Sequence, residues 1–388
     1  MNAIPGKTIA NADPLANLAP DAAEVQAAVG RVLASGRYIL GPEVEAFERQ
    51  FVSWMGLPDC VTVASGTDAL EFALRATGVR PGDGVVVPAN TASATVAAVV
   101  SAEARPVFCD VDPDTMCLSP ARLAELLASP RGAGVRAVIP VHLYGHPCSM
   151  WRITALSAER SLILVEDCAQ AIGARWEEKK AGTWGRAAAF SFYPTKNLAA
   201  LGDGGAVVTA NATVAAEVRA LRQYGWHERY VSSGRGGRNS RLDEMQAAIL
   251  AVRLPSLHNA NQRRRVLAQR YFARLAGSGL RLPPPDDGPV HPVFHQFVIR
   301  TEKRDGLRRW LAAHGIVAQV LYPVPVHRQP AFSAFAPEDP GALCECERCC
   351  AEVLSLPVHP ALSDEEVDFV AARVLDWVRA GSPTAETS

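Results

Sequence analysis

The stretch "AAAFSFYPTKNLAALGDGGAVVT" at residues 187–209 contains two apolar runs joined by a turn that holds a single lysine, Lys196. The runs, at 187–192 and 205–209, are continuous rather than alternating, which is typical of strands covered on both faces. No acidic partner stands close to Lys196 in the sequence, whereas a surface lysine is more often found on a helix among other charges. Lys196 is therefore either an ordinary surface residue or a buried amine retained for chemistry.

Five similar apolar runs precede this stretch, and helical stretches such as "TDALEFALRAT" and "PARLAELLA" fall between several of them. Strands that alternate with helices predict an α/β fold with a mostly parallel sheet, here of seven strands. In such sheets, ligands bind beyond the carboxyl ends of the strands. The five runs are "CVTVA" (60–64), "GVVVP" (84–88), "RPVFCD" (105–110), "RAVIPV" (136–141) and "SLILVED" (161–167).

The size and charge of the chain narrow the classes of protein to consider. A length of 388 residues suggests two domains or one large domain with a smaller one, and 48% hydrophobic residues suffice for a large core. The formal net charge of −1 disfavours nucleic acid or an anionic membrane as the main partner. Apolar stretches of about 20 residues and the pattern of a secretion signal are both missing, so a cytoplasmic protein is expected.

Nine cysteines are scattered along the chain. Cys60, Cys109 and Cys168 lie in or beside apolar runs, so we expect small buried side chains in a reducing compartment. The segment "LCECERCC", which holds Cys344–Cys350, admits a zinc site as one interpretation. Its spacing lacks the two separated pairs of a typical zinc module, and its charged neighbours indicate an exposed loop or the start of a helix. We predict no metal site, and leave this segment open.

The segment "SGTDALEFALRA" follows the first predicted strand, and it begins with Ser65, Gly66 and Thr67. The first backbone N–H groups of a helix are free, and the helix dipole is positive there. Gly66 allows the close approach of an anion and the Thr67 hydroxyl can donate to it, which suits a phosphate. A plain N-cap by Ser65 or Thr67 explains the same residues, and is favoured when the motif is considered alone.

A buried carboxylate and an amine are predicted at neighbouring strand ends. Asp167 ends a buried strand, where an unpaired carboxylate is costly; it either caps a helix that starts in "AQAIGA" or faces a protonated nitrogen. Gln170 could point into the same cleft. An apolar pocket would lower the pKa of Lys196 and make it a nucleophile for carbonyls. An anion site, an acid and a lysine on one sheet edge are what pyridoxal phosphate requires.

The sequence resembles the DegT/DnrJ/EryC1/StrS family of pyridoxal-phosphate sugar aminotransferases from about residue 34 to residue 367. The resemblance implies the aspartate-aminotransferase-like fold (fold type I), with a large cofactor-binding domain at 1–255 and a smaller C-terminal α/β domain at 256–388. It also implies a homodimer with shared active sites. The matching stretches are "VASGTDALEFAL", "RPVFCDVDPDT", "VIPVHLYGHP", "VEDCAQAIGA", "SFYPTKNLAALGDGGAVVT", "GRNSRLDEMQAAIL" and "VLYPVPVHRQPAF".

The resemblance further implies a role for individual residues. Lys196 is the catalytic amine that carries the cofactor, Asp167 keeps the pyridine nitrogen protonated, and Gln170 approaches the ring hydroxyl. Ala92 departs from the family, which usually has an aromatic residue stacked on the ring at this position, so stacking is either supplied otherwise or absent. The residues that the resemblance implies for phosphate binding are Gly66, Thr67, Ser191 and Asn239. Of these, Asn239 is implied to reach the phosphate in the site of the neighbouring subunit.

Family habit implies L-glutamate as the amino donor and a nucleotide-linked ketosugar as the acceptor. The segment "YPTKNLAALGDGG" looks like that of members acting on dTDP-3-keto-6-deoxyhexoses, whereas members acting at carbon 4 more often carry "TTGEGG". Tyr224, Tyr322 and His327 are candidate sugar contacts, although "LYPVPVHRQP" is equally well interpreted as a rigid loop. His142 is left without a role. The alternatives are an aminotransferase for a 4-keto sugar or cyclitol, a sugar dehydratase (in which histidine typically replaces the lysine) and a non-enzymatic regulator.

Overall fold

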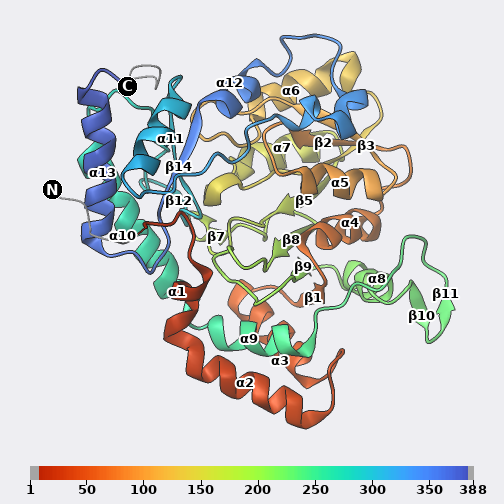
Figure 1. Ribbon diagram of the computed structural model, residues 1–388. Helices are drawn as coiled ribbons and strands as arrows, with labels where there is room; N and C mark the ends of the chain where they lie inside the picture. The colour runs from red at the N-terminus through yellow and green to blue at the C-terminus, as the bar shows by residue number, and fades with distance from the viewer. Residues whose placement is uncertain (1–7, 383–388) are drawn as a thin grey trace.

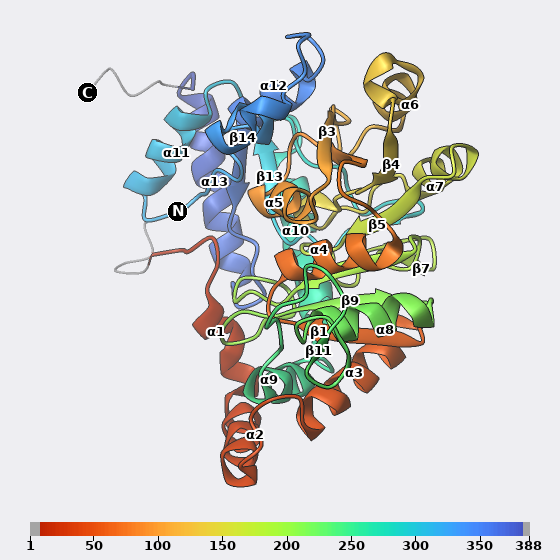
Figure 2. The same cartoon turned by 90° about the vertical axis from the view of Figure 1, so that its right-hand side faces the viewer.

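The computed structural model describes residues 8–382, and its central feature is a seven-stranded sheet (Figures 1 and 2). The strand order is β1-β9-β8-β5-β4-β2-β3, and every pair is parallel except the two that involve β9. The prediction of a mostly parallel seven-stranded sheet is confirmed, because each strand overlaps its predicted run. The bounds are β1 (Asp59–Val63), β2 (Gly84–Pro88), β3 (Arg105–Cys109), β4 (Val135–Val138), β5 (Ile163–Asp167), β8 (Ala187–Ser191) and β9 (Gly205–Thr209).

Both faces of this sheet are covered by helices. On β8, Ala187 and Ala189 pack into one hydrophobic cluster, whereas Ala188 and Phe190 pack into another on the opposite face. The first cluster includes α4 (Gly66–Thr77), α5 (Ser93–Ser101), α6 (Pro120–Ala128), α7 (Met150–Glu159) and α8 (Ala212–Leu221). The second includes α3 (Pro42–Met55) and α9 (Glu244–Arg253), which lie below the sheet in Figure 1.

Helix α4 begins and ends where its sequence provides caps. The Ser65 side chain accepts a hydrogen bond from the Asp68 N–H at the start, and Gly78 ends the helix with a φ of 97°, which favours glycine. Four residues that recur at helical spacing along α4 form its inner face and are all buried: Leu70, Ala73, Leu74 and Thr77. This rigid packing fixes the first turn of α4 at the carboxyl edge of the sheet.

The C-terminal part of the chain builds a third hydrophobic cluster. It joins α10 (Leu257–Leu275), α11 (Arg304–Ala313) and α13 (Asp364–Arg379) to the antiparallel pair β13 (Phe297–Arg300) and β14 (Val353–Leu356). Ile9, from the other end of the chain, packs into the same cluster. The predicted domain boundary between residues 255 and 256 falls in the short connection between α9 and α10, and it stays a prediction.

No helix within residues 8–382 is long and apolar enough to cross a bilayer.

The other helices, strands and 3-10 turns are short or lie at the periphery. The remaining elements are α1 (Pro14–Leu18), α2 (Ala22–Ser35), α12 (Cys344–Glu352), the strands β6 (Arg175–Trp176), β7 (Lys179–Lys180), β10 (Trp226–Glu228), β11 (Val231–Ser232) and β12 (Val290–His291), and the 3-10 turns η1 (Ala19–Asp21), η2 (Pro130–Gly132), η3 (Leu143–Gly145), η4 (Val326–Arg328) and η5 (Pro330–Phe335).

The cysteines lie largely as predicted. Cys60, Cys109 and Cys168 are buried. The segment around "LCECERCC" is the start of a helix, because α12 begins at Cys344, which is exposed. The other three cysteines of this segment are buried rather than exposed as expected, because helical spacing places them on the face that packs into the first hydrophobic cluster. They are Cys346, Cys349 and Cys350.

Candidate active site

A cavity of about 220 Å³ lies at the carboxyl ends of the parallel strands and brings together most of the predicted site residues. Its lining follows the ends of β1, β2, β4, β5 and β8, as expected for an α/β sheet. The predicted residues that line it are Gly66, Thr67, Ala92, Asp167, Gln170, Ser191, Lys196 and Tyr322.

The first turn of α4 offers free hydrogen-bond donors to this cavity. The backbone amides of Gly66 and Thr67 have no partner within residues 8–382, whereas the Asp68 amide is bound by the Ser65 cap at 3.1 Å. A Cβ added to Gly66 would lie 2.7 Å from the Cβ of Ser191, so only glycine fits there. Two free amides beside the hydroxyls of Thr67 and Ser191 form a donor set that fits a phosphate. The N-cap interpretation of Ser65 is also confirmed, and the two are compatible.

Asp167 ends β5 with its side chain buried in the cavity wall, 5% exposed. One carboxylate oxygen accepts a hydrogen bond from the Thr95 hydroxyl at 2.8 Å, and the other accepts one from the Ala169 amide at 3.1 Å. Burial raises the pKa of Asp167, an effect opposed by these two bonds and by the positive charge of Lys196. The interpretation of Asp167 as a helix cap is wrong, because the segment after it forms turns rather than a helix.

Lys196 follows β8 in a turn closed by the bond from its own amide to the Tyr193 carbonyl. Its side chain is partly buried and lines the cavity, and its Nζ has no hydrogen-bond or ion-pair partner in the part of the chain that the structure describes. Burial lowers the pKa of Lys196, and the nearby Asp167 carboxylate partly offsets this effect. The side chain is therefore a free amine in a cavity rather than an ordinary surface charge.

Gln170 links the floor of the cavity to a tyrosine at its mouth. Its Oε1 accepts a hydrogen bond from the Tyr144 amide at 2.6 Å, and its Nε2 donates to the Tyr322 hydroxyl at 2.9 Å. Burial, with a smaller effect from Asp167, raises the pKa of Tyr322 to about 12, so this phenol keeps its proton at neutral pH. Tyr322 thus presents a fixed hydroxyl to the cavity.

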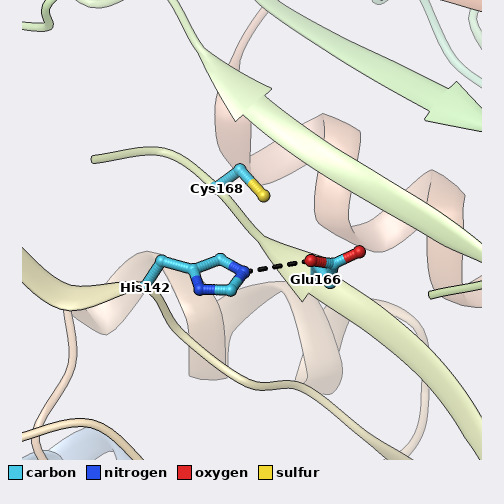
Figure 3. Close-up of side chains that lie close together, drawn as sticks. All are labelled: His142, Glu166 and Cys168. Atoms are coloured by element: carbon cyan, nitrogen blue, oxygen red, sulfur yellow. Dashed lines mark hydrogen bonds and ion pairs between the residues drawn. The ribbon is translucent and has the colours of Figure 1, made fainter. Parts of the chain in front are cut away.

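His142 and Glu166 form a buried pair behind the cavity, together with Cys168 (Figure 3). The Nδ1 of His142 accepts a hydrogen bond from the Cys148 amide at 3.0 Å, so its Nε2–H donates to Glu166 at 3.1 Å. Glu166 also accepts three backbone amides, those of Gly182, Trp184 and Gly185. Within residues 8–382 these three side chains are the one group close enough to hold a metal. However, the imidazole and the carboxylate already form hydrogen bonds with each other and with backbone amides.

Three predicted residues lie away from this cavity. Asn239 is exposed, and Tyr224 is 40% exposed with its ring against that of Trp226. His327 is buried elsewhere and forms a hydrogen bond with Glu347 at 2.9 Å. None of the three contributes to the cavity lining within a single chain.

The cavity also contains residues that the sequence analysis missed. Thr95 donates the hydrogen bond that orients Asp167, and its hydroxyl lies 2.8 Å from that of Thr91. Tyr193 and Asp203 complete one wall. The signal for Thr91 was its position just after a predicted strand, the same criterion that identified Asp167 and Lys196, whereas Thr95 lies in the first turn of α5.

The fold and the cavity together define a class of protein. A seven-stranded sheet of this order, with an anion cradle, a buried carboxylate and a free amine at its carboxyl edge, is that of the α/β pyridoxal-phosphate enzymes of fold type I. The chain belongs to the DegT/DnrJ/EryC1/StrS aminotransferase family, whose model matches residues 20–375. Members of this family depend on pyridoxal phosphate, and the chain is an aminotransferase of this kind.

Similar proteins of known name cover almost the whole chain. The dTDP-3-amino-3,4,6-trideoxy-alpha-D-glucose transaminase of Streptomyces venezuelae is 47% identical over 360 residues, which are 92% of each chain. The erythromycin biosynthesis sensory transduction protein EryC1 of Saccharopolyspora erythraea is 46% identical over 354 residues, 90% of this chain and 94% of that one. The crystal structure of DesV from S. venezuelae in complex with a ketimine intermediate superposes with a TM-score of 0.91 and 44% identity, over 96% of this chain and 99% of that chain.

Proposed function

We propose that this aminotransferase transfers the amino group of L-glutamate to the 3-keto group of a dTDP-linked 6-deoxyhexose. The observation that carries the proposal is the free amine of Lys196 in the same cavity as the buried Asp167 carboxylate and the open amides of α4. The choice of dTDP and carbon 3 is supported by the 47% identity to a transaminase named for a dTDP-3-amino sugar. It agrees with the expectation from "YPTKNLAALGDGG".

The bound cofactor would supply an electron sink that stabilises negative charge on the carbon next to the transferred nitrogen. Asp167 would hold a proton on the ring nitrogen, because a buried carboxylate without a cation is costly. The α4 amides and the hydroxyls of Thr67 and Ser191 would bind the phosphate. Gln170 would lie beside the ring hydroxyl.

Lys196 would carry out the proton transfers. Its Nζ would take the proton from the α-carbon of the amino acid in the first half-reaction. Water would then release the keto acid, while the amino group would stay with the bound cofactor until the ketosugar accepts it with loss of one water. In the second half-reaction, the same amine gives a proton to carbon 3 of the sugar, so that one amino acid and one ketosugar yield one keto acid and one aminosugar. The lowered pKa of Lys196 increases the fraction of the unprotonated amine that can act as a base.

We propose a homodimer in which the exposed side chain of Asn239 completes the active site of the second subunit. Arg238 forms an ion pair with Asp68, and Ser240 donates to Asp68 at 2.6 Å, so both face the α4 of their own chain. The side chain between them, Asn239, is exposed, as expected where side chains alternate along an extended segment. The adjoining hairpin of β10 and β11 projects from the body of the molecule and exposes Tyr230, which is suited to contact a second copy (Figure 1).

The proposal also covers the sugar contacts and the location of the protein. Tyr322 is the sugar contact that the cavity supports, whereas Tyr224 and His327 stay predictions. A cytoplasmic location is proposed because all nine cysteines are free, as is usual in a reducing compartment.

The proposal is tested with purified holoenzyme, L-glutamate and a panel of dTDP- and UDP-linked 3-keto and 4-keto sugars, with Lys196→Ala as the control. We expect the dTDP-3-keto-6-deoxyhexose to give an aminosugar and 2-oxoglutarate in equal amounts, with a kcat/KM at least about tenfold above that of the 4-keto isomers. A preference for 4-keto sugars would refute the substrate assignment. Cofactor binding without turnover of any sugar in the panel would favour the regulatory alternative.

A further inference from the structure

A second cavity, of about 370 Å³, is also lined by Lys196. Lys196 and Asn197 form one wall, and Arg263 and Arg264 of α10 form another. Residues of α1 and η1 and the segment at 360–361 complete it. Lys196 is therefore the side chain that the two cavities share.

Arg264 is the unusual residue of this cavity. It is 4% exposed, yet its one hydrogen bond within residues 8–382 is a 3.3 Å contact with the Val358 carbonyl, and its Nε has no partner. Among the described residues, no carboxylate oxygen lies within 4.0 Å of its guanidinium. Burial lowers the pKa of Arg264 to about 10, which still leaves it charged at neutral pH. A buried cation without an anion is costly, so this position favours an anionic ligand.

The two other arginines of the cavity are already paired. Arg263 forms an ion pair with Asp364 at 2.7 Å, and the Arg253 guanidinium lies 3.7 Å from Asp21. Asp21 is the one acidic side chain that lines the cavity. Arg264 is therefore the cation whose charge a ligand would balance.

The buried groups beside Arg264 offer no negative charge. They are His295 and His359, and burial lowers the pKa of both. The positive charges of Lys196 and then Arg264 add to this effect at His295, and that of Arg264 adds to it at His359, whose pKa falls to about 4. His295 donates its Nδ1–H to the Asn197 side chain at 3.0 Å, so it is held in a network that leads back to the turn of Lys196. The carboxylates of Asp13 and Glu366 act on His359 from its other neighbours, but neither forms an ion pair with the Arg264 guanidinium among the described residues.

We propose that this second cavity binds a small dicarboxylic acid, and that Arg264 is the residue that holds its carboxylate. The inference rests on the proposed function in that the amino donor, L-glutamate, is such an acid. A planar guanidinium fork binds a carboxylate with two parallel hydrogen bonds, which a neutral ligand cannot match. The fork also fits a phosphate, so the choice of an acid rests on the carboxylates of the proposed amino donor. The volume is within the usual range for small-molecule sites, and Lys196 lines both cavities, so an acid held here lies beside the proposed catalytic amine.

The test uses glutarate, a dicarboxylate that has no amino group and cannot be transaminated. Its dissociation constant is measured by calorimetry on the holoenzyme of the wild type, Arg264→Met and Arg265→Met. Arg265 is the matched control, because it is the next residue of α10, pairs with Asp286 at 3.4 Å and does not line the cavity. We expect Arg264→Met to weaken glutarate binding roughly 10- to 100-fold, the worth of one charged hydrogen-bonded pair, and Arg265→Met to change it less than about twofold.

A second variant covers the case in which Arg264→Met does not fold. Ala361 is exposed at the cavity lining, so Ala361→Glu is expected to fold and to weaken glutarate binding by placing a like charge in the cavity. Unchanged glutarate affinity in either folded variant overturns the proposal. So does a loss of affinity for dTDP rather than glutarate, which would make the cavity a diphosphate site. Failure of the proposed function has a different signature: glutarate binds in the wild type and depends on Arg264, but no ketosugar is aminated.

Discussion

Replacing Asp167 with asparagine removes the negative charge from the coenzyme cavity while the side chain keeps its size. The carboxylate accepts bonds from the Thr95 hydroxyl at 2.8 Å and the Ala169 amide at 3.1 Å. In Asp167→Asn, the remaining oxygen can keep the amide bond, and the Thr95 hydroxyl can turn to Thr91, 2.8 Å away. The fold should therefore survive, and any loss of activity can be assigned to the lost charge.

The size of the loss follows from one charged hydrogen bond. Such a bond contributes about 1.5–3 kcal/mol, so the protonated ring nitrogen should be destabilised enough to slow the half-reaction roughly 10- to 150-fold. Stopped-flow absorbance after mixing the holoenzyme of Asp167→Asn with L-glutamate measures this rate. A rate within about twofold of the wild type would refute the reasoning and leave Asp167 as a structural residue.

The same substitution should have the opposite effect on the cofactor-free protein. Burial raises the pKa of Asp167, so the folded state favours the protonated carboxyl, and the stability that this group contributes is lost as the pH rises through its folded pKa. At neutral pH, Asp167→Asn should therefore melt at or above the temperature of the wild type. The difference should vanish below about pH 4, where the carboxyl is protonated in both states. A lower melting temperature of the variant at neutral pH would contradict this account.

Two further predictions concern the phosphate site. Gly66→Ala places a Cβ 2.7 Å from that of Ser191, so it should weaken pyridoxal phosphate binding about tenfold or more in a fluorescence titration. Gly30→Ala is the control, because a Cβ at that position has nothing within 4 Å. Equal affinities of the two variants would contradict the assignment of the first turn of α4 as the phosphate site. If Asn239 serves the neighbouring subunit, co-expressed Lys196→Ala and Asn239→Asp chains, each inactive alone, should regain activity in roughly a quarter of the sites. Inactive mixed dimers, verified by differential tags, would refute the shared site.

The sheet and the core of the site were predictable from the sequence because local patterns encode them. Continuous apolar runs identify buried strands, and Asp167 and Lys196 follow such runs directly. Thr95 was not identified, because its hydrogen bond to Asp167 spans 72 residues. Arg264 stands in the run "QRRR" at 262–265, which as a sequence resembles a solvated helix surface; only the packing of α10 shows that this one arginine is buried.

The positions of Asn239 and His327 could not be predicted from the sequence for a different reason. The place of Asn239 depends on a second subunit, which no local pattern describes. His327 was placed among the sugar contacts because of its loop, but its ring is held by Glu347, 20 residues further along the chain. Pairings of this kind depend on how η4 and α12 meet in space.

The central claim is that Lys196 is the amine that carries the cofactor, and chemical trapping tests it most directly. The holoenzyme is reduced with borohydride, which fixes the bond between an amine and pyridoxal phosphate, and is then digested and analysed by mass spectrometry. We predict that the cofactor is found on the peptide that contains Lys196, and that Lys196→Ala yields no modified peptide. Cofactor fixed to a different lysine, or an equal yield from Lys196→Ala, would contradict the account.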